Sequence, residues 1–588
     1  MVLLRKTLYI LAFALLMASC ANRGIGPQGG PKDSIPPIPL HYSPEQGALE
    51  FKGKRIEVTF NEYLQLNDVA SNLLMSPPQQ TPPDVKARGK RLMIQFQDTL
   101  RDSTTYTLDF GDAVCDYHEK VPLHGFSFYF STGSEIDTLE TTGYVYDAET
   151  LNPVKGVMVG IHSNKADSAF ERLPFDRIAK TDSAGFFRIG NIHQGTYRLY
   201  ALDDISRDYR LTVGEARAYQ EETISPLDST PSILFLFKEE QQRLYLQKTT
   251  RDEQHKITLL FSAPQDSALS LRALRPSETD SMKTDTAWID PMPYIHTQYS
   301  AKGDTVTLWL TDSIAIAQDS LFLEARYQRT DSLYNLEWYV DTIRAIWRAQ
   351  RLTARMKEAQ DRKNRNRRLD LKTNARKDFD LYDTLYVLCS SPLAMIETDS
   401  IHLFERTEAG LNPVPFTIAP YDSLTMRLQV LADWKEGNNY ELALDSGALH
   451  DVYGVTHIKA NYPLQIKTLS DYSTLRVKLN PFVANARIQV LDGKDQVLRE
   501  LPAVPEGAFF EYLKPGTYYL RLYVDENGDG KWTTGNWEQK RQPEPMYYFP
   551  EKIQTKSNWD FDEEWDYLAK PQTESKPQAL IKAAPKKK

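Results

Sequence analysis

The pentapeptide FSFYF at residues 126–130 places a phenylalanine at every second position. Successive side chains of a β-strand point to opposite faces, so this spacing predicts a strand that buries one face. The same period recurs upstream in three further rows: Ile56, Val58 and Phe60; Leu92, Ile94 and Phe96; and Tyr106, Leu108 and Phe110. Clusters of Pro, Asn, Asp and Gly separate these rows. The pattern therefore predicts a β-sandwich over residues 39–133.

The composition favours several domains of β-structure. A chain of 588 residues exceeds one hydrophobic core, and at ~100–200 residues per domain it predicts about four to six modules. A supply of 32 Tyr and 24 Phe favours strands over helices. The net charge of −9 argues against a nucleic-acid partner. We therefore predict an all-β fold of sandwiches in series.

Residues 1–19 have the pattern of a signal peptide. Arg5 and Lys6 precede an apolar run that is far shorter than the ~20 residues of a membrane-spanning helix. The sequence Met17-Ala18-Ser19-Cys20 then resembles a lipobox, although Met17 departs from the usual leucine. The resemblance implies that Cys20 carries a lipid such as palmitate and anchors the chain in a membrane. The alternative is an ordinary secretory signal followed by a chance cysteine.

Residues 20–38 are rich in Gly and Pro and predict a flexible linker. Beyond Cys20 the chain holds only Cys115 and Cys389, in different predicted domains. We therefore expect two buried thiols rather than a disulfide.

The first predicted sandwich resembles the bacterial Ig-like domain. The motifs that carry this resemblance are Pro36-Pro37, Ser43-Pro44, Val58-Thr59-Phe60-Asn61-Glu62 and Phe128-Tyr129-Phe130-Ser131-Thr132. The resemblance implies a structural spacer or adhesion module without catalytic residues.

Residues 138–204 are similar to the prealbumin-like sandwich of the carboxypeptidase regulatory domain. The similarity is carried by Gly143–Asp147, Pro153–Val157, Thr181–Phe187 and Gly195–Leu199. In carboxypeptidases this module accompanies a catalytic domain, for which no candidate segment stands out here.

The rest of the chain divides by the same criteria. After a connector at 205–232, a second sandwich is expected over 233–343, with inward rows at Ile257, Leu259 and Phe261, at Val306, Leu308 and Leu310, and at Leu321 and Leu323. Residues 378–468 again resemble an Ig-like sandwich, and residues 471–560 a prealbumin-like module. We predict a disordered tail over 561–588, which ends in three lysines.

Residues 344–377 are a basic insertion. They hold 13 Lys or Arg against 3 acidic residues, with only a thin apolar stripe. We expect a short solvated helix or disordered linker, with an electrostatic contact surface as the alternative.

One further motif has the chemistry of a calcium loop. Asp525, Asn527 and Asp529 present oxygens at alternate positions, and Gly530 allows the turn that would add the carbonyl of Lys531. Asn536 replaces the glutamate that closes an EF-hand loop, so any site would be weak, with a dissociation constant of ~10⁻⁴–10⁻³ M. The alternative is a turn satisfied by its own backbone bonds.

An internal repeat links this loop to an earlier one. Gly516-Thr517-Tyr518-Tyr519-Leu520 repeats Gly195-Thr196-Tyr197-Arg198-Leu199. The same offset pairs Asp204 with Asp525, Ser206 with Asn527, Asp208 with Asp529 and Gly214 with Gly535, whereas Tyr209 stands in place of Gly530. We therefore expect two related modules with one type of acidic loop.

The motifs of common enzyme classes do not stand out. The His118-Glu119 and His124 group lacks the i, i+4 histidine pair of zinc proteases, and the sequence contains no Gly-x-Ser-x-Gly or Cys-x-x-Cys motif. We therefore predict a protein without catalytic residues, and no cofactor except the calcium considered above.

The module set, with its spacer Gly29–Pro37, resembles the Ig-like lipoproteins of Bacteroidota. This resemblance implies a lipid-anchored scaffold or binding protein of the outer membrane that contacts another envelope protein, as an accessory of outer-membrane protein assembly or export. Ala21-Asn22-Arg23-Gly24 carries no acidic residue, which favours the periplasmic face. The alternatives are a surface adhesin or glycan-binding lipoprotein and, less favoured, an envelope hydrolase with accessory modules.

Overall fold

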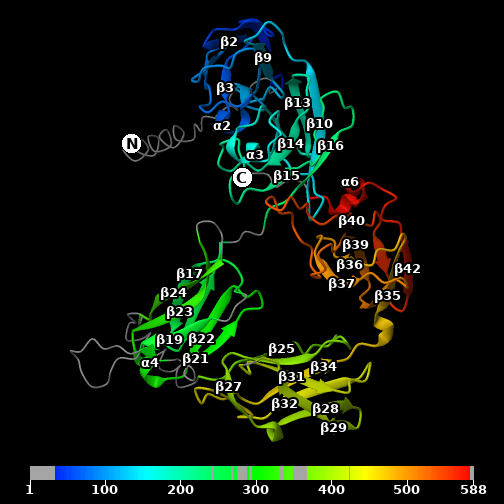
Figure 1. Cartoon of the computed structure of the whole chain (residues 1–588). Helices are drawn as coiled ribbons and strands as arrows, with labels where there is room; N and C mark the ends of the chain where they lie inside the picture. The colour runs from blue at the N-terminus through cyan, green and yellow to red at the C-terminus, as the bar shows by residue number, and fades with distance from the viewer. Residues whose placement is uncertain are drawn as a thin grey trace, which may run out of the picture. The chain divides into compact units, whose positions relative to one another are not determined.

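The computed structural model describes residues 33–239, 243–265, 269–274, 288–289, 295–331, 336–348, 367–422 and 424–582. The strands of this part of the chain form five β-sandwiches in series, coloured from blue to red in Figure 1. Their described residues fall into two compact units, one made by residues 33–238 with 582 and the other lying within residues 239–581. The predicted all-β fold is confirmed. The predicted signal peptide, Cys20 and most of the linker lie outside the described residues.

The first module forms because the four predicted rows all face one core. Phe128 and Phe130 are fully buried between the sheets, and burial of one such side chain stabilises the fold by about 1.5–3 kcal/mol. The sheets have the orders β1-β2-β6-β5, β4-β7-β9 and β3-β8. Their elements are β1 (Pro39–Ser43), β2 (Arg55–Phe60), β3 (Leu64–Leu66), α2 (Val69–Asn72), β4 (Leu74–Ser76), β5 (Asp84–Arg88), β6 (Arg91–Gln95), β7 (Thr105–Asp109), β8 (Val114–Asp116) and β9 (Ser127–Ser131).

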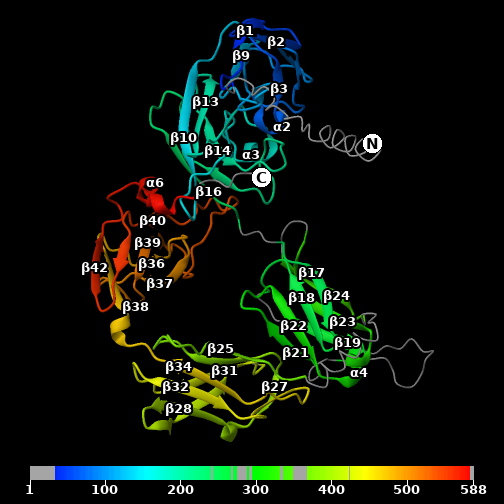
Figure 2. The same cartoon turned by 180° about the vertical axis from the view of Figure 1, so that it is seen from behind.

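The second module is a sandwich with the sheet orders β13-β10-β16 and β12-β11-β14-β15. Its elements are β10 (Leu139–Asp147), β11 (Met158–His162), α3 (Ser168–Arg172), β12 (Arg177–Lys180), β13 (Phe186–Ile192), β14 (Arg198–Leu202), β15 (Arg217–Tyr219) and β16 (Ser232–Leu236). Figure 2 shows β10 and β13 side by side. The predicted end at residue 204 and the predicted connector at 205–232 are wrong, because β15 pairs with β14 and β16 pairs in parallel with β10.

The third module packs the rows predicted around Leu259, Leu308 and Leu323, all of which are fully buried. Its sheet orders are β17-β18-β22-β21 and β20-β19-β23-β24. The elements are β17 (Leu246–Glu253), β18 (Lys256–Phe261), β19 (Ser270–Leu274), β20 (Trp288–Ile289), β21 (Ile295–Tyr299), β22 (Thr305–Leu310), α4 (Ser313–Ala317), β23 (Ser320–Thr330) and β24 (Leu336–Ile346).

The fourth module repeats the strand plan of the first with one added edge strand, β29. Its sheets run β25-β26-β31-β30, β29-β28-β32-β34 and β27-β33. The elements are β25 (Leu371–Thr373), β26 (Leu385–Cys389), β27 (Leu393–Ile396), η1 (Thr398–Ser400), β28 (Ile401–Thr407), β29 (Gly410–Pro413), β30 (Phe416–Pro420), β31 (Arg427–Ala432), β32 (Asn439–Leu444), β33 (Leu449–Asp451) and β34 (Ala460–Gln465).

The basic insertion is shorter than the predicted range 344–377. Strand β24 extends to Ile346, and β25 begins at Leu371. Both ends of the range therefore belong to the adjoining sandwiches. Its centre, residues 349–366, lies outside the described residues, so the expected helix or linker there stays a prediction.

The fifth module repeats the strand plan of the second. Its sheets run β38-β35-β42 and β37-β36-β39-β40, and β42 pairs in parallel with β35 as β16 does with β10. The elements are η2 (Leu469–Asp471), β35 (Ser473–Leu479), β36 (Ala486–Leu491), β37 (Val497–Pro502), β38 (Ala508–Leu513), β39 (Gly516–Val524), β40 (Met546–Tyr548), β41 (Ile553–Thr555), β42 (Asp560–Trp565), α6 (Gln572–Ser575) and η3 (Gln578–Leu580). The predicted disordered tail from residue 561 is wrong as far as residue 582, because β42 and the buried Leu580 lie in it.

Matching hydrogen bonds support both repeats. The Tyr197 hydroxyl donates to the carbonyl of His193 and the Tyr518 hydroxyl to that of Lys514, each at 2.8 Å. In the Ig-like pair, the Tyr106 hydroxyl accepts from the amide of Arg101, and the Tyr440 hydroxyl accepts from that of Lys435. The second and fifth modules thus share one tyrosine hydrogen bond to a loop, and the first and fourth modules share another. No helix among the described residues is long and apolar enough to span a membrane.

Candidate functional site

The predicted calcium loop follows β39 and is closed by one carboxylate. Asp525 is 7% exposed. Its Oδ1 accepts hydrogen bonds from the amides of Gly528 at 2.7 Å and Asp529 at 3.2 Å, and its Oδ2 accepts from that of Gly530 at 2.9 Å. Charged acceptors bind backbone amides strongly. The Asp525 side chain therefore binds three consecutive amides of the turn.

A second carboxylate, which the sequence reasoning missed, crosses the same loop. Glu544 is 4% exposed and accepts from the amide of Glu526 at 2.9 Å and from that of Thr533 at 2.8 Å. Burial raises the pKa of the Glu544 carboxyl, and these backbone bonds offset the rise only in part. Asp525 and Glu544 together form a two-carboxylate frame around the loop.

The early loop has the same frame. Asp204 accepts from the amides of Asp208 at 3.2 Å and Tyr209 at 3.1 Å, as Asp525 does from Asp529 and Gly530. Glu215 takes the role of Glu544, accepting from the amides of Ser206 and Thr212. Tyr209 adopts the left-handed φ of +62°, close to the +77° of Gly530. The structure thus places Asp204 and Asp525 at the same point of their modules.

The remaining predicted calcium ligands are engaged within the loop. The Asn527 amide carbonyl accepts from the amide of Asp529, and Asp529 Oδ1 accepts from that of Lys531 at 2.8 Å. In the described part of the chain, no group of three or more His, Cys, Asp or Glu side chains lies close enough to hold a metal ion. Calcium binding here stays a prediction.

The repeat offset of 321 residues explains why Glu544 escaped prediction. It pairs Asp204 with Asp525, but it places Glu215 on Asn536. The later loop is eight residues longer between its two carboxylates, so a constant offset fails within it. The signal that could have found both is a glutamate two positions before the next strand, since β15 begins at Arg217 and β40 at Met546.

The fourth and fifth modules meet at a buried carboxylate, here named the second junction. Asp380, with a side chain 2% exposed, lies 2.7 Å from Lys514 Nζ and 2.8 Å from an Arg376 guanidinium nitrogen, and it accepts a 2.9 Å hydrogen bond from the Tyr472 hydroxyl. Burial raises the pKa of Asp380, but Lys514 and Tyr472 outweigh it and hold the pKa below its usual value. A network of charges and hydrogen bonds therefore fixes this contact.

The first and second modules meet in a comparable way, at the first junction. The Arg177 guanidinium lies 3.3 Å from Asp137 and donates to the carbonyl of Asn191 at 2.9 Å. Across the contact, the amide of Ile178 donates to Ser76 Oγ at 3.1 Å. Seven residues separate the last strand of one module from the first of the next in both junctions, 132–138 and 466–472. The first and second modules are thus joined in the same way as the fourth and fifth, and each pair is a repeated unit.

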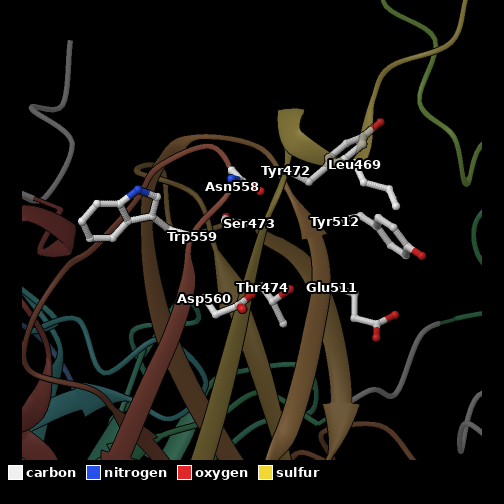
Figure 3. Close-up of a pocket in the computed structure, with 9 residues that line it drawn as sticks. All are labelled: Leu469, Tyr472, Ser473, Thr474, Glu511, Tyr512, Asn558, Trp559 and Asp560. Atoms are coloured by element: carbon white, nitrogen blue, oxygen red, sulfur yellow. The ribbon is translucent and has the colours of Figure 1, made fainter. Parts of the chain in front are cut away.

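A shallow pocket of about 240 Å³ lies beside the second junction. Figure 3 shows Trp559 and Tyr512 on opposite sides of Thr474 and Asp560. Ligand pockets typically begin at ~300 Å³. The pocket is therefore smaller than a typical ligand-binding site.

The two thiols are buried as expected. Cys115 and Cys389 are free cysteines with exposures of 3% and 6%. Burial raises the pKa of the Cys389 thiol to about 12 and also raises that of Cys115. Both are therefore neutral at physiological pH and resemble small apolar side chains.

The comparison with protein families bears on the first module. Residues 33–132 match the model of the bacterial Ig-like domain. This chain contains an Ig-like domain. The match agrees with the strand plan of the first module and with the resemblance predicted from the sequence.

Two solved structures of bacterial proteins are distantly similar to this chain. The surface-layer protein SbsC is 9% identical, with 82% of this chain and 64% of that chain covered and a TM-score of 0.14. BcpA, the major pilin subunit of Bacillus cereus, is 8% identical, with 73% of this chain and 99% of the pilin covered and a TM-score of 0.14. This chain thus covers less than two thirds of SbsC. No curated protein matches.

Proposed function

We propose that the chain is a lipid-anchored scaffold of a bacterial cell envelope that presents its sandwiches to a protein partner. The observation that carries this proposal is the repeated unit of Ig-like and prealbumin-like modules. In the first copy, the amide of Ile178 donates to Ser76 of the other sandwich, and in the second copy Lys514 forms an ion pair with Asp380 of the other sandwich. A scaffold needs such fixed junctions, because a hinged pair would not hold a binding surface in place.

The anchor in this proposal is Cys20. The lipobox-like Met17-Ala18-Ser19-Cys20 and the Gly/Pro-rich linker after it support attachment by lipid. We place the anchor in the outer membrane with the modules on its periplasmic face. The partner in this proposal is a protein of outer-membrane assembly or export.

The proposal is tested by affinity purification of the tagged full chain from detergent-solubilised outer membranes. We expect an outer-membrane protein to copurify with the wild type. A Cys20→Ser variant should lose incorporated palmitate and leave the membrane fraction. Protease cleavage of the wild type on intact cells, without a copurifying protein, would contradict the periplasmic scaffold and favour a surface adhesin.

A further inference from the structure

The last described segment of the fifth module lies along the outer edge of a sheet. Residues 566–581, here named the strap, follow β42, and both views of the chain show α6 of the strap beside β40 (Figures 1 and 2). Strand β40 is the last strand of the sheet β37-β36-β39-β40. The amide of Phe549 donates to a carbonyl of β39, and the carbonyl of Pro545 accepts from an amide of β39. Alternate residues of a strand direct their main-chain groups to opposite sides, so the amides and carbonyls of Met546 and Tyr548 point away from β39.

The strap binds those outward groups with side chains. The Gln572 amide donates to the carbonyl of Met546 at 2.9 Å. The amide of Tyr548 donates to Ser575 Oγ at 3.2 Å. These two groups are the ones that a further antiparallel strand would bind. The strap therefore imitates strand pairing without forming a strand.

An ion pair fastens the strap across the sheet. Lys576 Nζ lies 2.7 Å from Asp495 Oδ2, and the two side chains are 2% and 1% exposed. Asp495 belongs to the turn between β36 and β37 and also accepts a 2.9 Å hydrogen bond from the Tyr548 hydroxyl. A buried ion pair gives less net stability than apolar packing of the same volume, because both charges lose their hydration.

The second module closes the equivalent edge with its main chain. The amide of Arg217 in β15 donates to the carbonyl of Phe237 at 2.8 Å, and the amide of Phe237 donates back at 2.9 Å. On the same sheet, the Phe170 ring of α3 stacks on Tyr200 at 4.2 Å. One copy of the module therefore seals this sheet with main-chain pairing and aromatic packing. The other covers it with two hydrogen bonds and an ion pair of side chains, beside the packing of Tyr567 on the Tyr547 ring at 5.0 Å. Polar contacts are typical of interfaces that open and close.

We propose that the β40 edge is a docking surface for an extended strand of a partner protein, and that the strap occupies this edge until the partner strand displaces it. The partner strand supplies an N–H to Met546 and a carbonyl to Tyr548, and a basic side chain that reaches Asp495. Strand addition to a free edge is a common mode of peptide recognition, and proteins protect such edges when no partner is bound. The proposal goes beyond the scaffold function and does not depend on the lipid anchor.

The test uses the full chain and a fluorescent peptide of residues 570–582 as the probe. We expect Lys576→Met to raise hydrogen exchange in the strap and at β40 by at least about tenfold, because the ion pair is lost. The variant should bind the peptide, whereas the wild type should not. Lys570→Met is the matched control, since Lys570 is an exposed lysine of the same strap, and it should behave as the wild type.

The pair Asp495→Asn with Lys576→Met removes both charges of this ion pair, so it gives an answer even where the single variant unfolds the module. Faster exchange confined to the strap and β40 supports release of the strap. Unchanged exchange in this double variant would show that the strap is a fixed part of the fold. Release of the strap in Lys576→Met without peptide binding would overturn the docking surface.

Discussion

Lys514 Nζ of the fifth module lies 2.7 Å from Asp380 Oδ2 of the fourth module. The Asp380 side chain is buried, with an exposed fraction of 2%. Asp380 also forms an ion pair with Arg376 and accepts a hydrogen bond from the Tyr472 hydroxyl. The fourth and fifth modules therefore share one charge network, and the stability of each is expected to depend on the other.

Asp380→Ala should destabilise this pair of modules. Removal of the carboxylate takes away the ion pair with Lys514 and the acceptor of the Tyr472 hydroxyl, whereas Arg376 keeps Asp383, and we expect a cost of about 1–3 kcal/mol. Urea unfolding of the full chain measures the loss. Asp378→Ala is the control, because Asp378 is 67% exposed, and it should change stability by no more than about 0.5 kcal/mol. Equal effects of the two variants would contradict a buried network.

The same carboxylate should make the junction sensitive to acid. Its folded pKa lies below the unfolded value of ~3.9, so the ionised form stabilises the fold above about pH 4. That contribution is lost as the pH falls through the folded pKa. We expect thermal melting between pH 3 and pH 7 to show a steeper fall towards low pH in the wild type than in Asp380→Asn. Parallel curves would show that Asp380 does not contribute.

Tyr197→Phe and Tyr518→Phe should each lower stability by about 0.5–1.5 kcal/mol, since each removes one hydrogen bond to a main-chain carbonyl. Denaturant unfolding of the two variants measures the loss. Tyr117→Phe, at a tyrosine that is 58% exposed, serves as the control with an expected effect near zero. A loss in only one of the two modules would weaken the case that they are repeats.

Gly530→Ala should destabilise the acidic loop by about 1 kcal/mol, because Gly530 has a φ of +77° that an L-residue adopts at a cost. Nothing lies closer than 3.8 Å to an added Cβ, so backbone strain alone decides the effect. Gly493→Ala is the matched control, as this glycine has open space and no positive φ. Thermal melting compares the two, and equal melting would rule out strain at Gly530.

Calcium binding to residues 525–531 predicts a small rise in melting temperature at millimolar calcium, reversed by chelator. Asp529→Ala should remove that response, whereas Asp208→Ala in the early loop should leave it intact. Isothermal calorimetry with calcium chloride provides an independent measurement. If neither calcium nor chelator moves the melting temperature, the loop is a turn held by Asp525 and Glu544.

The sandwich cores were predictable because one buried face imposes a period of two on each strand. Phe126, Phe128 and Phe130 illustrate this, since all three are buried as expected. The module ends were not predictable in this way. Strand β16 pairs with β10, and β42 pairs with β35, each some 90 residues earlier and in parallel. Such distant pairing leaves no local pattern.

The candidate sites were predictable only where they form local motifs. The Asp525 turn follows from residues spaced two apart, whereas Glu544 joins it from 19 positions further along the chain. Asp380 and Lys514 come from different modules, and neither stands out in sequence. A single aspartate in a polar stretch shows no sign that folding will bury it.

The parallel pairing of β10 with β16 has a mechanical consequence. Because the first and last strands of this sandwich run side by side in the same direction, the chain enters at one end and leaves at the other. A pull on the two ends therefore loads the hydrogen bonds between these strands in shear, all at once, rather than opening them one after another. The fifth module pairs β35 with β42 in the same way. We therefore expect both modules to resist a pull along these strands.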